Sequence, residues 1–212
     1  MSLPRLYAVV DHEASRRAGC DPLELARAFV AGGARLLQVR AKGLPAADLL
    51  AVSEAVVAAG AAHGARTIVN DRADVASLAG AAGVHVGQDD LPASAARGLL
   101  GPGALVGVST HSVQQAREAL GQPVSYVAVG PVFGTTTKDT GYAPVGLSLV
   151  REVAALAAPL GIPVVAIGGI TLESAPEVIR AGAASVCVIT DLLRGDPAAR
   201  VRAYIDTLSS LD

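Results

Sequence analysis

The sequence has few aromatic residues, so its core must be built almost without them. Aromatic side chains make up 3% of the 212 residues and tryptophan is absent, whereas 51% of the residues are hydrophobic. Small and branched aliphatic side chains therefore have to fill the interior. Such side chains are typical of parallel strands that are buried on both faces. The length fits one domain with a large core.

A concentration of charge of one sign is also missing. The formal net charge is −2, and no cluster of basic residues occurs along the chain. Proteins that bind nucleic acids carry such clusters, so we expect no nucleic-acid partner.

Cysteine is scarce, and the two cysteines stand far apart. Cys20 and Cys187 form no CxxC motif, which argues against a zinc or dithiol site. Reduced thiols are the usual state in the cytosol. The N-terminal sequence MSLPRLYAVVD has too short an apolar stretch for a secretory signal. We therefore expect a cytoplasmic location.

Long uninterrupted hydrophobic segments are absent as well. Residues 153–170 carry no charge, but Pro159, Gly161, Pro163 and the Gly168-Gly169 pair interrupt them. A membrane-spanning helix needs about 20 continuous apolar residues. The segment is better explained as a helix end, a turn and a buried strand, and we expect no membrane association.

Short apolar runs alternate with longer helical patterns along the whole chain. The predicted strands are residues 6–10, 36–40, 67–70, 84–87, 105–109, 126–130, 164–167 and 185–189. Three predicted helices cover residues 22–31, 71–79 and 197–208, and three more begin at residues 45, 92 and 147. Two further helices are predicted from apolar stripes within residues 113–120 and 175–179. This alternation implies parallel strands that are connected through helices.

Eight such units in 212 residues are close to the minimum length for a closed barrel. The expected fold is therefore of the α/β class, a single (β/α)8 TIM barrel. Residues 1–212 are expected to form one catalytic domain. A doubly wound open sheet is the alternative architecture.

Polar residues gather where the predicted strands end. The strand ends carry Asp11, Arg40 with Lys42, Asn70-Asp71, Gln88 to Asp90, Ser109, Thr135 to Lys138, Gly168-Gly169 and Thr190. The strand starts at Leu36, Leu105 and Val164 are apolar instead. Active sites of (β/α)8 barrels lie at the C-terminal ends of the strands. The pattern therefore predicts an enzyme.

The second predicted strand carries two cations and an amide. In LLQVRAKG, Gln38, Arg40 and Lys42 alternate with apolar residues, and a period of two places all three on one side of a strand. The planar fork of arginine and the compact charge of lysine both suit phosphate oxygens. Solvated charges at a strand end are the alternative interpretation.

Two carboxylates follow neighbouring strands. Asp71 comes directly after the third strand, and Asp89 and Asp90 follow the fourth. Asp71 and Asp90 are therefore expected to converge. Carboxylates without a histidine or cysteine cluster suit Mg²⁺, which often bridges protein and substrate phosphates. Alternatively, these aspartates cap the helices that follow them.

A glycine pair follows the seventh strand. Gly168 and Gly169 allow backbone N–H groups to approach an anion, and a following helix N-terminus would add its dipole. The loops after strands seven and eight of these barrels commonly bind phosphate, and Ile189 and Thr190 would form the opposite wall. A simple tight turn is the alternative.

The remaining signals are weaker. His85 is expected to lie in the core, whereas His111, on the catalytic face, is a candidate proton carrier. Ser109 shows no Ser-His-Asp pattern. The loop at residues 131–146, with the segment GTTTKDTGYAP, lacks apolar periodicity. It is long for such a connection, which is typical of a lid or binding loop.

These motifs, taken in order, resemble the thiamine-phosphate synthase family across essentially the whole chain. The matching segments are QVRAK from Gln38, ND at Asn70-Asp71, GVHVGQDDLP from Gly83, GVSTH from Gly107, GPVFGTTTK from Gly130, IGGI from Ile167 and VIT ending at Thr190. Each segment alone is modest, but together they make a specific match.

The resemblance implies a Mg²⁺-dependent transferase of thiamine biosynthesis with a (β/α)8 barrel. The family joins 4-amino-2-methyl-5-diphosphomethylpyrimidine (the pyrimidine diphosphate) to a thiazole phosphate and releases thiamine phosphate and pyrophosphate.

The resemblance also assigns site residues. The pyrimidine diphosphate would be held by Gln38, Arg40, Lys42, Asn70, Ser109 and Lys138. The metal would be held by Asp71 and Asp90, and the thiazole phosphate by Thr135, Thr137, Gly169, Ile189 and Thr190. The catalytic residues implied are Arg40, Lys42, Ser109 and Lys138.

Two positions depart from the family pattern. Ala41 stands where the family commonly has glutamate, and its side chain should point away from Gln38 and Arg40. Thr190 replaces a common serine but keeps the hydroxyl.

Two other functions compete with the synthase. A thiazole tautomerase is a related barrel that typically lacks the complete diphosphate and metal set, whereas Gln38, Asp71, Asp90 and Lys138 are present here. A non-catalytic sensor of phosphorylated ligands is the alternative from another class. The sequence leaves the oligomeric state open, with a homodimer as one option, and does not tell whether the thiazole carries a carboxylate.

Overall fold

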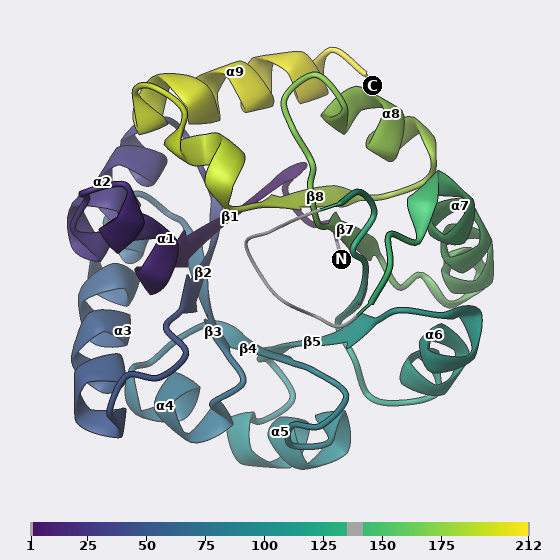
Figure 1. The fold of residues 1–212 in the computed structure, drawn as a ribbon. Coiled ribbons are helices and arrows are strands. Elements are labelled where there is room, and N and C mark those ends of the chain that lie inside the picture. The colour runs from purple at the N-terminus through teal and green to yellow at the C-terminus, as the bar shows by residue number, and fades with distance from the viewer. Residues whose placement is uncertain (1, 135–141, 212) are drawn as a thin grey trace.

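The computed structural model describes residues 2–134 and 142–211, and within them eight parallel strands close into a barrel (Figure 1). The strands are β1 (Leu6–Asp11), β2 (Leu36–Arg40), β3 (Arg66–Asn70), β4 (Gly83–Val86), β5 (Leu105–Thr110), β6 (Tyr126–Val129), β7 (Val164–Ile167) and β8 (Ser185–Val188). Each strand pairs with the next in the chain, and β8 pairs with β1. The predicted (β/α)8 barrel is confirmed, and the open-sheet alternative is wrong.

Helices surround the ring of strands (Figure 1). They are α1 (His12–Arg17), α2 (Pro22–Ala31), α3 (Ala46–Ala61), α4 (Ala73–Leu78), α5 (Ala93–Leu100), α6 (Val113–Leu120), α7 (Gly146–Ala157), α8 (Ala175–Arg180) and α9 (Pro197–Ser209). Two short 3₁₀ helices, η1 (Ala158–Leu160) and η2 (Thr190–Leu193), follow α7 and β8.

The core has two layers, because alternate residues of each strand point inward and outward. The outer layer packs the strands against the helices with small aliphatic residues such as Val10, Val39 and Val127. The inner layer fills the barrel and includes Tyr7, Val9, Leu36, Ile68, Leu105, Tyr126, Ala128, Val165 and Cys187. Two of the few aromatic residues therefore lie inside the barrel.

The segment after β3 differs from its predicted course. A helix was expected from residue 71, but α4 begins only at Ala73. Asp71 has a φ of 65°, in the left-handed region, and Arg72 has a φ of −100°. Neither residue is helical, so the chain makes a turn at Asp71 and Arg72 before the helix starts.

A short helix that the sequence pattern does not reveal follows β1. Asp11 is the last residue of β1, and its side chain caps α1 by accepting a hydrogen bond from the Ala14 backbone N–H at 2.8 Å. α1 has six residues, too few to show a periodic apolar stripe.

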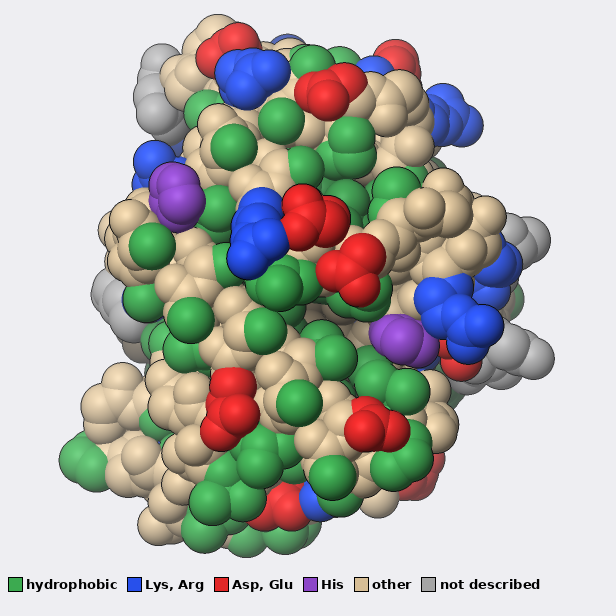
Figure 2. Space-filling model, turned by 90° about the vertical axis from the view of Figure 1, so that its left-hand side faces the viewer, with side chains coloured by type: hydrophobic (Ala, Val, Ile, Leu, Met, Phe, Trp, Pro, Cys, Tyr) green, Lys and Arg blue, Asp and Glu red, His purple; other side chains and the backbone are tan. Residues whose placement is uncertain are grey.

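The outer surface mixes charge signs. Figure 2 shows the side of the molecule that carries α1, α2 and α3, where acidic and basic side chains are interspersed with hydrophobic and neutral ones. Among the described helices, none has both the length and the apolar character that a bilayer-spanning segment requires.

Candidate active site

A pocket of about 290 Å³ lies at the C-terminal ends of the strands. The predicted substrate residues that line it are Gln38, Arg40, Asn70, Ser109, Gly169, Ile189 and Thr190. They come from β2, β3, β5 and the segments after β7 and β8. Barrel closure thus brings together residues that are as much as 152 positions apart in the chain (Gln38 to Thr190). Predicted residues Thr135, Thr137 and Lys138 lie outside the described part of the chain.

Arg40 forms a buried ion pair. Its guanidinium Nη1 donates to Oδ2 of Asp11, and the two residues are 8% and 2% exposed. The Arg40 Nε is also buried and has no hydrogen-bond partner among the described residues. A solvated charge at a strand end is therefore the wrong interpretation of Arg40. Its unsatisfied donor, in a residue that lines the pocket, suits a ligand oxygen.

Lys42 has a different position from the one that strand periodicity predicts. β2 ends at Arg40, so Lys42 lies in the following turn and not on the inner face of the strand. Its Nζ is 3.1 Å from Oδ2 of Asp71, and its side chain is 49% exposed. Lys42 therefore contacts Asp71 in the turn after β3, and it is not among the residues that line the pocket.

Asp71 and Asp90 converge as predicted. Burial raises the pKa of Asp71, a side-chain hydrogen bond with Asp90 raises it further, and Lys42 lowers it. Asp90 is held in place because its Oδ2 accepts from the Gly87 backbone N–H at 2.7 Å. The capping alternative is wrong, since Arg72 and Pro92 occupy the starts of α4 and α5 without a side-chain cap.

The backbone at Asp71 is unusual as well. Among the described residues, Asp71 is the one non-glycine residue with positive φ. A left-handed conformation costs a side-chain-bearing residue free energy, and such positions cluster at functional sites. No group of three or more histidine, cysteine, aspartate or glutamate residues suitable for a metal occurs in the described chain. A pair of carboxylates still fits Mg²⁺, which keeps several water or phosphate ligands.

The glycine pair after β7 forms the opposite wall. Gly168 and Gly169 have φ values of 102° and 64°. A Cβ at Gly169 would lie 2.5 Å from the Gly134 carbonyl oxygen and 2.8 Å from the Phe133 Cβ. Only glycine fits here, because both the backbone angle and the close approach exclude a side chain.

The helix predicted after this wall is present as α8, but it does not begin directly at the glycine pair. α8 starts at Ala175, after an intervening turn. η2 instead begins at Thr190, directly after Ile189. The backbone N–H groups at the start of η2 therefore adjoin the pocket beside Gly169, because β8 pairs with β7.

His85 faces the pocket from inside the core. It is 8% exposed, its Nε2 lies 2.9 Å from Ser109 Oγ, and its Nδ1 lies 3.0 Å from the Tyr126 hydroxyl. The expected core position is right, but the residue also lines the pocket. The sequence assigned no contact to Asp11 and no role in the site to Tyr7, His85 or Tyr126. The available signal was a polar side chain at an inward-facing strand position.

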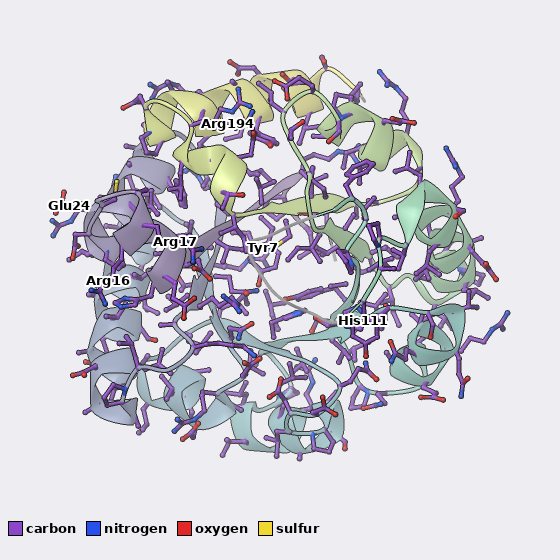
Figure 3. The ribbon with its side chains drawn as sticks, viewed as in Figure 1. Tyr7, Arg16, Arg17, Glu24, His111 and Arg194 are labelled. Carbon is purple, nitrogen blue, oxygen red and sulfur yellow. The ribbon has the colours of Figure 1, made fainter. Side chains whose placement is uncertain are left out.

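His111 lies at the wall formed by β5 and β6 (Figure 3). Its Nδ1 hydrogen-bonds to the Gly130 carbonyl oxygen, and its ring stacks on Tyr142 with centroids 3.8 Å apart. A carbonyl only accepts, so Nδ1 carries the proton. A role for His111 as a proton carrier stays a prediction.

Ala41, where the resembled family commonly has glutamate, belongs to the outer core layer. It therefore points away from Gln38 and Arg40, as expected.

The chain is similar to known proteins over nearly its whole length. The family model described as thiamine monophosphate synthase matches residues 6–192. A thiamine-phosphate synthase from Anaeromyxobacter dehalogenans is 47% identical over 205 residues, covering 95% of this chain and 87% of the relative. One from Roseiflexus castenholzii is 40% identical over 202 residues, covering 95% and 86%. The solved thiamine phosphate pyrophosphorylase from Pyrococcus furiosus has a TM-score of 0.86 and 28% identity, covering 98% of this chain and 96% of that one.

Proposed function

The chain belongs to the thiamine monophosphate synthase family, and we propose how its residues divide the work of that family's reaction. It is a transferase of thiamine biosynthesis. In the reaction, the C–O bond between the pyrimidine methylene group and the diphosphate breaks. A C–N bond forms between that methylene carbon and the thiazole nitrogen, and pyrophosphate leaves.

One observation supports this assignment of roles, namely that two groups of hydrogen-bond donors, one from β2 and β3 and one from the segments after β7 and β8, line two walls of a single pocket. Arg40 and Asn70 line the pocket on the side of β2 and β3, and Gly169 and Thr190 line it on the side of β7 and β8. A reaction on one monophosphate needs only one of these walls. Two walls suit two phosphorylated substrates held against each other.

The wall at β2 to β5 binds the pyrimidine diphosphate in this proposal. Arg40, Lys42, Asn70 and Ser109 contact the diphosphate, and Gln38 contacts the pyrimidine. Arg40 has a buried Nε without a partner in the described chain, and hydrogen bonds from fixed cations to a developing anion lower the barrier to its departure. Lys138 adds a further cation, by family resemblance.

The wall at β7 and β8 binds the thiazole phosphate. The backbone N–H groups of Gly169, Ile189 and Thr190 are the donors, and the positive φ of Gly169 permits the close approach that an anion requires. Thr135 and Thr137 complete this site, by family resemblance.

Asp71 and Asp90 would hold Mg²⁺. Their side chains lie close together, and oxygen ligands are the ones that Mg²⁺ prefers. When bound, the ion neutralises part of the negative charge of the departing diphosphate. Lys42, 3.1 Å from Asp71, would adjoin the same diphosphate.

The protein's own contribution is positioning and charge stabilisation. The electron-rich aminopyrimidine can carry positive charge at its methylene group as the C–O bond breaks. The pocket holds the thiazole nitrogen against that carbon, so that the bond-forming step is effectively intramolecular. The cations of the diphosphate wall stabilise the leaving group.

The test is a product balance. The protein is mixed with Mg²⁺, the pyrimidine diphosphate and thiazole phosphate, and pyrophosphate and thiamine phosphate are quantified together. Equal amounts of both are expected, and omission of the thiazole should leave only slow hydrolysis. If neither product forms while a thiazole carboxylate isomer interconverts, the tautomerase alternative is correct.

Gly169→Ala should raise the KM for thiazole phosphate about tenfold or more, because a Cβ displaces the backbone that donates to the phosphate. The KM for the pyrimidine diphosphate should change little. Gly161→Ala is the matched control, since Gly161 has the same φ of 64° but a Cβ there would meet nothing within 4 Å. Equal KM values in both variants would contradict the phosphate site.

The location of the enzyme and the extent of its catalytic domain remain part of the proposal. No disulfide joins Cys20 and Cys187, the two cysteines of the chain, and reduced thiols are the usual state in the cytoplasm. The two walls both belong to the barrel, so we assign catalysis to residues 1–212 as one domain.

A further inference from the structure

Five inward-facing side chains form one hydrogen-bonded chain across the floor of the pocket, which we call the floor chain. Gln38 Nε2 donates to the Tyr7 hydroxyl at 2.8 Å, and the Tyr7 and Tyr126 hydroxyls are 3.1 Å apart. Tyr126 reaches His85 Nδ1 at 3.0 Å, and His85 Nε2 reaches Ser109 Oγ at 2.9 Å. Figure 3 shows Tyr7 within the ring of strands.

Packing fixes the rings of the floor chain. Tyr7 and Tyr126 are 1% and 0% exposed. The Tyr126 ring stacks on His85 with centroids 5.6 Å apart and meets the Tyr7 ring edge-on at 6.0 Å. A Cβ at Gly107 would lie 2.0 Å from Tyr126 Cζ, so the glycine in β5 makes the space for this ring.

The hydrogen bonds of the floor chain run in one direction. An amide nitrogen only donates, so the Tyr7 hydroxyl accepts from Gln38. Tyr7 then gives its own proton to Tyr126, and Tyr126 gives its proton to His85 Nδ1. His85 is left with its proton on Nε2, which donates to Ser109 Oγ. In this arrangement each of the four hydrogen bonds has one donor and one acceptor, so the buried hydroxyls of Tyr7 and Tyr126 and both nitrogens of His85 have a partner, as buried polar groups require.

The two tyrosines keep their protons. Burial raises the pKa of the Tyr7 hydroxyl well above its ordinary value, and burial likewise raises the pKa of Tyr126. Both hydroxyls are therefore neutral, and each has one proton to donate.

The ends of the floor chain meet the pocket, since both Gln38 and Ser109 line it. The Gln38 Nε2 is engaged with Tyr7, which leaves the amide oxygen as the acceptor for a ligand. The Ser109 Oγ accepts from His85, which leaves the hydroxyl proton for donation to a ligand. The pocket floor thus offers an acceptor at one end and a donor at the other.

We propose that Tyr7, Tyr126 and His85 are positioning residues that fix this donor and acceptor pattern for the pyrimidine diphosphate. The proposal rests on the proposed function. The amino group of the pyrimidine donates to Gln38, and an anionic diphosphate oxygen, which can only accept, takes the proton of Ser109. A pyrimidine with an oxo group in place of the amino group would set two acceptors against each other at Gln38.

The first test needs no substrate. In protein labelled with ¹⁵N at histidine, NMR should show neutral His85 protonated at Nε2, with its signals identified by their loss in His85→Gln. Tyr126→Phe removes the proton donor to Nδ1 and should shift the ring toward a mixture of both tautomers. His85 protonated mainly at Nδ1 in the parent protein would overturn the proposal.

The second test separates the two substrates. Tyr126→Phe and Tyr7→Phe should each raise the KM for the pyrimidine diphosphate about tenfold, the effect of one misdirected hydrogen bond. The KM for thiazole phosphate should stay unchanged. Tyr204→Phe is the control, because it removes another buried hydroxyl, which hydrogen-bonds to Asp191 at 2.6 Å outside the floor chain. It should alter neither the His85 tautomer nor the KM for the pyrimidine diphosphate.

The outcomes distinguish this inference from the proposed function. An unchanged KM for the pyrimidine diphosphate in folded Tyr126→Phe would overturn the positioning role while leaving the synthase activity in place. If Tyr126→Phe does not fold, Tyr7→Phe and the tautomer of the parent protein decide the question. Absence of thiamine phosphate with the parent protein would overturn the function itself.

Discussion

Arg40→Ala should destabilise the folded protein by about 3–5 kcal/mol and lower turnover by about 10²-fold or more. The stability loss arises because Asp11 is 2% exposed and paired with Arg40. Removing the guanidinium leaves that carboxylate buried without a counter-charge. The turnover loss follows from the proposed function, in which the same guanidinium contacts the departing diphosphate. Urea unfolding measures the first effect, and steady-state kinetics measure the second.

A double variant separates the two roles of Arg40. Asp11→Asn together with Arg40→Gln removes both charges, and the asparagine oxygen can still cap α1 at the Ala14 N–H. Stability should recover largely, whereas turnover should remain low. Recovery of turnover in the double variant would show that Arg40 acts only through the fold.

An exposed ion pair provides the control for the stability effect. Arg27 and Glu24 form a pair on α2, with side chains 58% and 66% exposed. Arg27→Ala should cost at most about 1 kcal/mol, because water already solvates both charges. Equal losses at Arg27 and Arg40 would contradict the energetic role of burial.

Sequence-based prediction is most accurate for elements whose ends are marked by local signals such as capping residues. The helix at residues 22–31 was predicted with both its ends, and the structure explains why. Pro22 occupies the first turn, and Asp21 caps it by accepting from the Leu23 and Glu24 N–H groups. The apolar run at residues 36–40 likewise coincides with β2. Elements with such local signals need no tertiary information.

The contacts of the site depend instead on how the barrel closes. Period-two alternation correctly placed Gln38 and Arg40 inside, but it does not identify the side chain opposite each of them. Arg40 meets Asp11, 29 positions earlier, and His85 meets Ser109, 24 positions later. These pairings follow from strand register and barrel curvature, which local sequence does not encode.

Conformation at Asp71 is another feature that local rules miss. An aspartate before a helical pattern predicts a cap, but the residue adopts a φ of 65° and contacts Asp90 and Lys42 instead. The tertiary environment thus overrides the local preference. Such exceptions are expected where a side chain serves a site.

Asp90→Asn should abolish stabilisation by Mg²⁺ and lower turnover by about 10²-fold or more. Mg²⁺ that binds only the folded state raises the melting temperature of the parent protein as its concentration increases. The variant lacks one of the two proposed carboxylate ligands, so its melting temperature should not respond. Thermal unfolding across a Mg²⁺ series, with and without a chelator, measures this response independently of activity.

The same variant should be at least as stable as the parent when a chelator is present. The carboxyl groups of Asp71 and Asp90 lie close together, and asparagine at position 90 removes the repulsion between them. It also keeps an oxygen that accepts from the Gly87 N–H, as Asp90 does at 2.7 Å. Asp89→Asn is the matched control, since it makes the same change of charge one position earlier and should retain both the Mg²⁺ response and turnover. Full activity of Asp90→Asn with a chelator present would refute the metal assignment, because neither the ion nor the carboxylate would then be needed for the diphosphate to leave.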